Sequence, residues 1–402
     1  NTKGESNLNY GIVAEFNPFH NGHKYIVESL KNSGVDTVTA VMSESFVQRS
    51  ECACASPYLR TQMALANGVD LVLSLPVAYA TASAERFASA GVSVLASLGV
   101  ISALGFGSEC GSKALINECA TALLSDSFDS LVCKYLQDGV SYPDARSKAL
   151  QEGFSKSIAQ IVSEPNDILG VEYTKAIIKN GFCMDINPIK RIGASHDSKE
   201  AVGDICSASA VREMLINNES AKTFLPPETY SILKKATGEG KAPADFKKLE
   251  SAILYKLRTM SVEDFSKLCD VSEGLEHRLY TAVRSSSSLN EVLEKVKTKR
   301  YTLSRIRRII ICAFLGITKQ DVELPVPYIR VLGFNEKGAK LLKEAKERAT
   351  LPIVTKPAQI KELNKAAQRL FELECTARDL FSLALPQPDI CGKEMTDKII
   401  VW

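Results

Sequence analysis

The sequence predicts an α/β fold, with a mostly parallel sheet flanked by helices in the first half of the chain and a mainly α-helical region after it. Two observations predict this. In the first half, short apolar runs alternate with amphipathic helical patterns, which is typical of parallel strands joined by helices that cover both faces of a sheet. In the second half, helical patterns follow one another, with one further strand candidate near the end.

These patterns place the elements in order along the chain. Expected strands occupy residues 11–15, 37–42, 71–75, 103–107, 185–192 and 328–334. Expected helices occupy residues 23–33, 57–68, 82–98, 113–124, 207–218, 245–260, 262–268, 275–284, 289–298, 303–315 and 336–348, and the helical stretch 144–170 leads into another helix. The pair Pro226 and Pro227 and a loop rich in Gly, Lys and Pro over 236–243 indicate a boundary. We therefore expect two domains, residues 1–225 and residues 226–402.

Composition narrows the class of protein. The chain has 402 residues, of which 45% are hydrophobic and 24% charged, as in ordinary soluble globular proteins. Its net charge of +2 means that a nucleic-acid partner would have to be met by a local patch. No apolar run reaches the roughly 18 residues that span a bilayer, and residues 1–9 lack the apolar core of a signal peptide, so we expect a cytoplasmic protein without a membrane partner. The eleven cysteines offer no second pair at zinc-ligand spacing beyond Cys52 and Cys54, so we expect reduced thiols and no metal site.

The segment between the first strand and the first helix carries the strongest functional signal. It reads Phe-Asn-Pro-Phe-His-Asn-Gly-His over residues 16–23, with His20 and His23 at the start of the helix. Pro18 fixes the loop, and Gly22 allows close approach of a ligand. A helix N-terminus binds anions, and neutral imidazoles can donate hydrogen bonds to phosphates. The pattern predicts attack on the α-phosphate of a nucleotide with pyrophosphate leaving; the alternative is a capped helix with incidental histidines.

The order His-x-Gly-His resembles the signature of the nucleotidyltransferase superfamily, which class I aminoacyl-tRNA synthetases share. The longer string GIVAEFNPFHNGH resembles the bacterial tRNA(Met) cytidine acetate ligase family, and the similarity runs through most of the chain, including VLGFNEKGAKLL at 331–342. The resemblance implies a Rossmann-like nucleotidyltransferase domain with His20 and His23 as catalytic residues. It also implies that ATP is bound by Val13, Ala14, Glu15, Phe16, Asn17, Pro18, Phe19, His20, Asn21, Gly22, His23, Lys24, Tyr25, Ile26, Gly107, Asn166, Arg191, Ser209 and Arg212.

A second motif, Ser-Ala-Ser-Ala-Val-Arg over residues 207–212, begins an expected helix. Hydroxyls and free amides at a helix start, with Arg212 one turn in, can hold a phosphate and stabilise charge that develops on it. The stretch takes the place of the second superfamily signature, with Ala208 where many members have a hydroxyl. The alternative is an ordinary capped amphipathic helix. Without the resemblance, Asn166 would read as a helix cap and Arg191 as a surface charge.

A basic run follows in the second half. Residues 284–308 contain eight Lys or Arg and two Glu, a net charge of +6. On a helix, Arg305 and Arg308 would project to one side while apolar residues face inward. Such a patch suits an RNA backbone, and Tyr301 could stack on a splayed base, although charge runs are often only solvated helix faces. The predicted tRNA-binding residues are Lys297, Lys299, Arg300, Tyr301, Arg305 and Arg308.

Several positions depart from the pattern of the family. Among them are Glu44 and Ser45, where Gly-Asn is usual, Ser50, where Gly is usual, and the region of Pro57, where a lysine is usual. We expect these departures to lie where acetate or the incoming cytidine binds. They leave open whether the activity is retained.

The resemblance implies a two-step reaction. Acetate attacks the α-phosphate of ATP and gives acetyl-adenylate and pyrophosphate. Mg²⁺ is expected with ATP, held by phosphates and water. N4 of the wobble cytidine of elongator methionine tRNA then takes the acetyl group. Two alternatives are a small-molecule adenylyltransferase and a non-catalytic RNA-binding protein derived from this fold.

Overall fold

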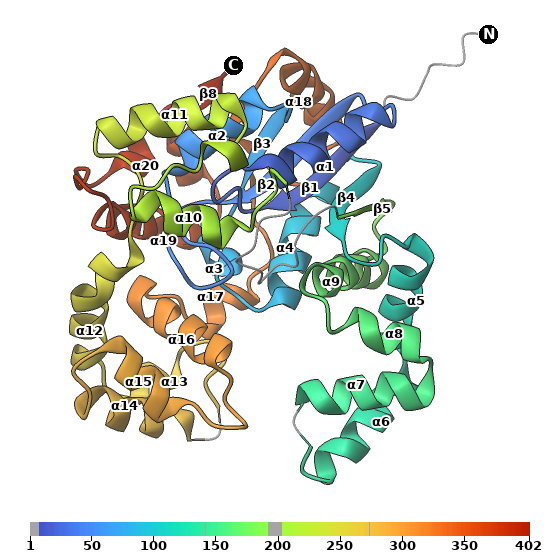
Figure 1. Ribbon diagram of the computed structural model, residues 1–402, viewed down its shortest axis with the longest axis vertical. Helices are drawn as coiled ribbons and strands as arrows, with labels where there is room; N and C mark the ends of the chain where they lie inside the picture. The colour runs from blue at the N-terminus through green and yellow to red at the C-terminus, as the bar shows by residue number, and fades with distance from the viewer. Residues whose placement is uncertain (1–7, 141, 192–202, 273) are drawn as a thin grey trace.

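The computed structural model describes residues 8–140, 142–191, 203–272 and 274–402 (Figure 1). Residues 1–7 of the polar N-terminus and Ile192, the expected end of a strand, lie outside these ranges. The strands are β1 (Asn9–Ala14), β2 (Thr37–Ser43), β3 (Leu71–Leu75), β4 (Ala103–Ser108), β5 (Asp185–Lys190), β6 (Ile329–Phe334), β7 (Ile353–Val354) and β8 (Ile400–Val401).

The helices between them follow the predicted alternation in the first half. They are α1 (Asn21–Asn32), α2 (Pro57–Ala66), α3 (Val77–Ala80), α4 (Ala84–Ser97), α5 (Lys113–Leu123), α6 (Asp126–Gln137), α7 (Tyr142–Gly153), α8 (Lys156–Ile161), α9 (Pro165–Asn180) and α10 (Ala208–Ile216). The later ones are α11 (Pro227–Gly238), α12 (Glu250–Thr259), α13 (Val262–Ser266), α14 (Leu275–Arg284), α15 (Leu289–Val296), α16 (Leu303–Leu315), α17 (Lys319–Glu323), α18 (Glu336–Arg348), α19 (Lys365–Ser382) and α20 (Lys393–Thr396), with 3₁₀ turns at Lys222–Phe224, Phe246–Leu249 and Pro357–Glu362. No helix of the described ranges is long and apolar enough to cross a membrane.

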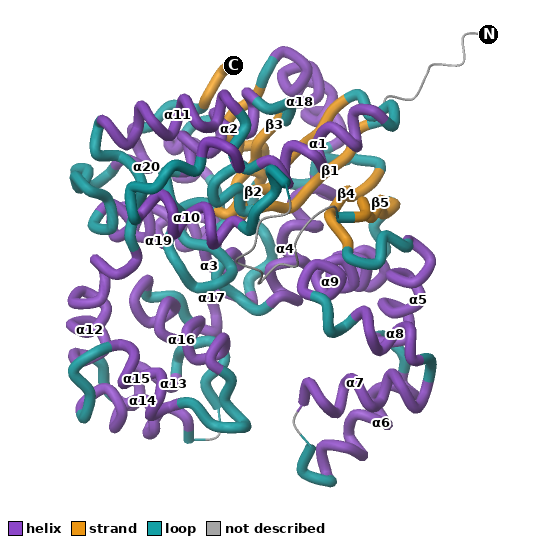
Figure 2. The backbone as a smooth tube through the Cα atoms, viewed as in Figure 1, coloured by secondary structure: helices purple, strands orange, loops and turns teal. Residues whose placement is uncertain are grey.

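The strands form one mixed sheet in the order β5-β4-β1-β2-β3-β6-β7, with β8 beside β6. Figure 2 shows the strands in orange among the helices. The five strands from β5 to β3 are parallel, and β6 pairs with β3 in the antiparallel sense. The predicted mostly parallel sheet is confirmed. Because β2 and β4 both flank β1, the strand order reverses at β1, and ligands of such sheets bind at the carboxyl ends of the strands beside this point.

Helices cover both faces of the sheet. Alternate residues of one strand enter different cores, as the pleat requires: Leu71, Leu73 and Leu75 belong to the cluster that includes α4, α9 and α16, whereas Val72 belongs to the cluster with α1, α2, α10 and α11. The central strands β2 and β3 are buried along their whole length, which explains their mainly apolar sequences.

Several helices were not expected from the sequence. The pair Pro226 and Pro227 reads as a break, yet Pro227 occupies the first position of α11, where a proline loses no hydrogen bond and its fixed φ suits a helix. Helices α6 and α19 were also not predicted. The predicted helical stretch 144–170 is divided, because Ser155 caps α8 and Pro165 begins α9.

The polypeptide does not keep to the division expected at residue 226. Strand β6 pairs with β3 and carries β7 and β8, so residues from the end of the chain complete the sheet of the first half. Helices α12 to α16 form a separate lobe below the sheet in the view of Figure 1. The mainly helical character of the second part holds for this lobe, but not for residues 329–354 and 400–401.

A buried ionic cluster ties this returning segment to the first half. The Arg330 guanidinium contacts the Glu44 carboxylate at 3.1 Å and also pairs with Glu394, and it donates to the Tyr58 hydroxyl at 3.1 Å. The carboxylates of Glu44 and Glu394 are fully buried. Glu44 also accepts from Ser74. Two buried carboxylates thus share a single arginine.

This cluster makes stability depend on pH. Burial raises the pKa of Glu44 to about 7; Arg330 opposes the shift and Glu394 adds to it. Between pH 4.5 and about 7, Glu44 therefore keeps a proton in the folded protein. In the unfolded chain its pKa is the ordinary 4.5, so the same group has released that proton. We expect wild-type protein to lose about 1–3 kcal/mol of unfolding free energy, relative to Glu44→Gln, as pH rises from 4.5 to 8. Urea denaturation of both proteins across this range measures the difference; a constant difference would contradict the assignment.

Candidate functional site

The predicted functional loop lies at the reversal point of the strand order, at the carboxyl end of β1. A cavity of about 300 Å³ opens there between the loop, the end of β4 and the start of α10. We call it the histidine pocket. Most predicted nucleotide-binding residues line it: Val13, Ala14, Glu15, Phe16, Asn17, His20, Gly22, His23, Ile26, Gly107, Asn166, Arg191, Ser209 and Arg212.

Five predicted residues of the same stretch are not among the residues that line the pocket. Pro18 and Phe19 are buried, and Asn21 donates to the backbone carbonyls of Asp204 and Thr223 at 2.9 and 3.0 Å. The remaining two, Lys24 and Tyr25, do not line the pocket either. The resemblance implied the whole stretch as a binding segment, whereas successive residues of a helix face different sides.

The two histidines occupy the first turn of α1. His20 is the N-cap residue, and its Nδ1 accepts a hydrogen bond from the backbone N–H of Gly22 at 3.0 Å. The Nδ1 of His23 accepts from the backbone N–H of His20 at 3.2 Å. The ring centroids lie 3.8 Å apart. The arrangement is a reciprocal capping box made of imidazoles, which fixes both rings at the mouth of the helix.

The direction of these hydrogen bonds determines the tautomers. A backbone N–H can only donate, so Nδ1 of each ring is the unprotonated nitrogen and Nε2 carries the hydrogen. Burial lowers the pKa of His23 well below its usual range, and His20 and Arg191 lower it further. At neutral pH, His23 is therefore an uncharged donor. Such a donor can bind a phosphate oxygen at a helix N-terminus.

The second motif packs directly against this loop. Ser207 caps α10 by accepting from the backbone N–H of Ala210 at 3.3 Å, and its hydroxyl lies 3.2 Å from that of Ser209. Arg212 donates to the backbone carbonyl of Asn17 at 2.9 Å. The hydroxyls and the guanidinium thus join the histidines in one pocket, as the sequence predicted.

The carboxyl end of β4 forms the opposite wall. Gly107 lines the pocket, and a Cβ there would lie 3.2 Å from Ile26 and 3.4 Å from Arg191. The Asn166 amide donates to Glu109. Asp167, which the sequence did not single out, accepts from the backbone N–H groups of both Glu109 and Cys110 at 2.9 Å. These bonds hold the loop after β4 against the start of α9.

An apolar wall completes the pocket. Phe106 and Tyr173 contribute rings whose centroids lie 5.8 Å apart, and Phe87, Ile168 and Leu169 line the same side. A planar base can be buried against such a surface. Sequence reasoning missed these residues, because apolar positions in α4, β4 and α9 read as ordinary core.

A buried arginine, Arg60, holds the loops that carry the site. It donates to the backbone carbonyls of Ala55 at 3.1 Å and Ser43 at 2.9 Å, and also to those of Glu15 and Glu44. Burial lowers its pKa to about 10, so it remains charged at neutral pH. The ends of β1 and β2 are thereby joined by one cation.

The departures from the family pattern do not cluster at the substrate side as expected. Glu44 and Ser45 are fully buried, and Pro57 is a buried first residue of α2, so these three belong to the core. Ser50 differs: it lines a second cavity and its φ is +64°, a left-handed conformation that glycine adopts more readily.

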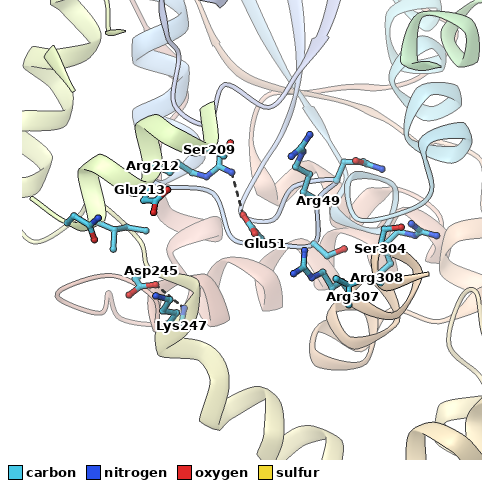
Figure 3. Close-up of a pocket in the computed structure, with 15 residues that line it drawn as sticks. Arg49, Glu51, Ser209, Arg212, Glu213, Asp245, Lys247, Ser304, Arg307 and Arg308 are labelled. Atoms are coloured by element: carbon cyan, nitrogen blue, oxygen red, sulfur yellow. Dashed lines mark hydrogen bonds and ion pairs between the residues drawn. The ribbon is translucent and has the colours of Figure 1, made fainter. Parts of the chain in front are cut away.

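The second cavity, of about 730 Å³, adjoins the histidine pocket (Figure 3). We call it the outer cleft. It lies between α10, the loop after β2, the segment before α12 and helix α16. Both cavities share Gln48, Arg49, Ser209 and Arg212. The cleft is also lined by Ser50, Glu51, Glu213, Ile216, Asn217, Asp245, Lys247, Leu303, Ser304, Arg307 and Arg308.

The basic run behaves differently from the prediction. Lys297, Lys299 and Arg300 are exposed, but Tyr301 is 8% exposed, so its ring packs in the core and is not open to stacking. Ile306 and Ile309 face inward as expected.

Two of the three arginines predicted to contact RNA instead bind Asp270, in the loop before α14. Arg305 donates to the backbone carbonyl of Asp270 at 2.9 Å, and Arg308 pairs with the carboxylate of the same residue at 2.9 Å. Arg307 was not predicted. It is exposed, lines the outer cleft and makes no side-chain hydrogen bond or ion pair within the described residues. The sequence signal that could have found Arg307 is its position on the helix, one turn after Leu303 and Ser304, which line the same cleft.

Comparison with known proteins shows which family this chain is similar to. The family described as HIGH Nucleotidyl Transferase matches residues 8–395. A tRNA(Met) cytidine acetate ligase of Thermoanaerobacter sp. (strain X514) is 38% identical over 398 residues, covering 97% of this chain and 98% of the relative. One from Caldicellulosiruptor saccharolyticus is 40% identical over 380 residues and 93% of each chain. The crystal structure of Thermotoga maritima TmcAL bound with alpha-thio ATP is similar at a TM-score of 0.91 and 32% identity, over 98% of this chain and 99% of that chain.

Proposed function

This chain belongs to the tRNA(Met) cytidine acetate ligase family, and from that premise we propose that it activates acetate with ATP and acetylates a cytidine of methionine tRNA. The observation that carries the proposal is the histidine pair. Its two Nε2 donors lie at the N-terminus of α1, in a pocket that also holds Arg191 and Arg212. Such a constellation is suited to an α-phosphate whose charge grows during displacement.

In the first step, acetate attacks the α-phosphate and pyrophosphate leaves. The Nε2–H groups of His20 and His23 donate to phosphate oxygens, and the arginines balance the developing charge. The apolar wall of Phe106 and Tyr173 receives the adenine. The ATP analogue bound by the Thermotoga maritima structure supports an ATP site here.

Magnesium is proposed to enter with ATP. The residues of the histidine pocket do not fit a protein-held metal: Glu15 is the only carboxylate among its described lining residues, and it accepts from the backbone N–H of Gln48 at 2.9 Å. The described ranges hold no cluster of three His, Cys, Asp or Glu suited to a metal. Phosphate oxygens and water would carry the ion.

In the second step, the acetyl group passes to N4 of the wobble cytidine of elongator methionine tRNA, as the family resemblance implies, and AMP leaves. Lys297, Lys299 and Arg300 remain proposed backbone contacts, because they are exposed on the helical lobe. A tRNA substrate supports the expected cytoplasmic location. A small-molecule adenylyltransferase would have no use for the exposed cations Lys297, Lys299 and Arg300.

Purified protein tests the proposal. We expect labelled pyrophosphate to exchange into ATP only when acetate is present, and N4-acetylcytidine to appear in methionine tRNA analysed by nucleoside mass spectrometry. ATP binding and tRNA binding without acetate-dependent exchange would instead support a non-catalytic RNA-binding protein.

A further inference from the structure

The outer cleft has charged groups that the activation of acetate does not use. Glu51 lines it at the boundary with the histidine pocket, and Arg307 and Lys247 line it farther out. We propose that this cleft receives one unpaired cytidine nucleotide of the RNA acceptor, and that Glu51 accepts the hydrogen bond and then the proton of the N4 amine. The inference rests on the proposed function, and it adds Glu51 as the residue that recognises the cytosine base and removes its proton.

The size and position of the cleft fit a nucleotide. Its volume of about 730 Å³ falls within the range of roughly 300–1,000 Å³ typical of small-ligand sites. It shares Arg49, Ser209 and Arg212 with the histidine pocket, so a base inside it reaches the place where acetyl-adenylate forms. Enzymes that modify a base take it out of its stack into such a pocket.

Glu51 is held at this boundary by Arg212. Its Oε2 lies 3.4 Å from Nη2 of Arg212, while Nη1 of the same guanidinium donates to the backbone carbonyl of Asn17 at 2.9 Å. The Glu51 side chain is 41% exposed, so a ligand can reach its carboxylate. Figure 3 shows Glu51 between Arg212 on α10 and Arg307 on α16. The Arg212 guanidinium thus links the Glu51 carboxylate in the outer cleft to the histidine loop at Asn17, which is proposed to hold the phosphates.

The chemistry of a carboxylate selects cytosine. Its oxygens accept hydrogen bonds from the N4 amine, whereas uracil presents the O4 acceptor at the same position and would be repelled. The amine of cytosine is a weak nucleophile, so removal of its proton assists attack. Glu51 can therefore serve both in recognition and in transfer.

The transfer step balances with these groups. The N4 lone pair attacks the acetyl carbon of acetyl-adenylate, an N–C bond forms, and the carbonyl π electrons move to oxygen. The carbonyl then re-forms and the bond to the phosphate oxygen breaks, with its electron pair leaving on AMP. One N4 proton passes to the Glu51 carboxylate and then to water. Acetyl-adenylate is supplied by the first step of the proposed function.

Cations farther out fit the flanking phosphates. Arg307 and the ammonium of Lys247 have no side-chain partner within the described residues, and both line the cleft. Asp270 engages both Arg305 and Arg308, so it anchors the helix from which Arg307 extends. Unpaired cations beside a nucleotide-sized cleft suit a single-stranded RNA backbone.

The Glu51→Gln variant tests the assignment. With unmodified tRNA(Met) transcript, we expect the rate constant of acetyl transfer to fall about 100-fold. The preference in binding for that transcript over one with uridine at the acceptor position should also shrink. Hydroxylamine, a small nucleophile added in place of RNA, should still trap acetohydroxamate. Glu347→Gln, an exposed carboxylate on α18, is the matched control.

The outcomes separate the two proposals. If wild-type enzyme forms no acetohydroxamate from acetate and ATP, the proposed function fails. If wild type forms it, and Glu51→Gln acetylates tRNA at the wild-type rate with unchanged preference for cytidine, the assignment of Glu51 is overturned while the function stands.

The Arg307→Ser variant tests the cleft independently. We expect the dissociation constant for tRNA(Met) to rise about three- to tenfold, and the slope of log affinity against log salt to fall by about 0.7, as for one lost single-strand phosphate contact. Arg348→Ser on α18 controls for loss of a surface charge, since its guanidinium lies in an exposed pair with Glu344 at 3.2 Å. Equal affinity and slope for the Arg307 variant and wild type would overturn the RNA assignment of the cleft.

Discussion

Replacing His23 with alanine is expected to lower acetate-dependent exchange of pyrophosphate into ATP by about 10²–10³-fold. The substitution removes one preorganised Nε2 donor from the α-phosphate site. It also removes the Nδ1 acceptor that positions the backbone N–H of His20. Affinity for tRNA should stay near that of wild type, because His23 lines the histidine pocket and not the outer cleft.

The His23→Gln variant sharpens this test. A glutamine amide can place a donor near the former Nε2, so we expect part of the exchange activity to return. Thermal unfolding of both variants controls for the loss of the helix cap, which we expect to cost about 1 kcal/mol. Exchange by the alanine variant at close to the wild-type rate would remove His23 from the mechanism.

Replacing Arg330 with methionine is expected to destabilise the fold by about 3–5 kcal/mol, the largest effect on stability that we predict. The Arg330 side chain is 5% exposed, and its loss leaves Glu44 and Glu394 buried without a cation. Burial raises the pKa of the nearby Glu374 well above its usual range, and Glu44 and Glu394 raise it further, so the neutral form of this carboxyl is favoured and it cannot replace the lost cation.

Urea denaturation measures this loss, and pH provides an internal check. Carboxyl groups that take up protons need no cation, so the deficit of Arg330→Met should shrink as pH falls towards 5. Adding Glu44→Gln to the variant should recover part of the stability, because one buried charge is removed. Arg348→Met, which breaks an exposed pair, should cost less than about 1 kcal/mol. An equally small cost for Arg330→Met would mean that the buried cluster contributes little.

Short-range sequence patterns predicted the fold, and they predicted that the histidine loop and the Ser207–Arg212 motif belong to one site. The histidine loop, the Ser207 cap and the position of Arg212 follow from short-range rules for helix starts, and the structure brings them together in one pocket. The apolar wall of Phe106 and Tyr173 could not be predicted, because it is defined by the distance between elements far apart in the chain.

The basic run shows a different limit. Counting charges identified residues 284–308 as a strongly basic segment. The count could not predict which of these basic side chains would pair with a carboxylate elsewhere in the fold. Asp270 takes Arg305 and Arg308 into a structural contact, and Arg307 is left to face the cleft. Glu44 shows the same limit, because its partner Arg330 lies 286 residues away.

The wall shared by the two cavities affects the fate of the activated acyl group. Acetyl-adenylate is a mixed anhydride that water hydrolyses, and it would form beside Arg49, Ser209 and Arg212, which also face the outer cleft. RNA that fills the cleft would cover this side and exclude solvent. When RNA is bound, acetyl-adenylate would react mainly with the N4 amine of cytidine. When RNA is absent, water would hydrolyse it. Futile turnover of ATP would therefore be set by occupancy of the neighbouring cavity.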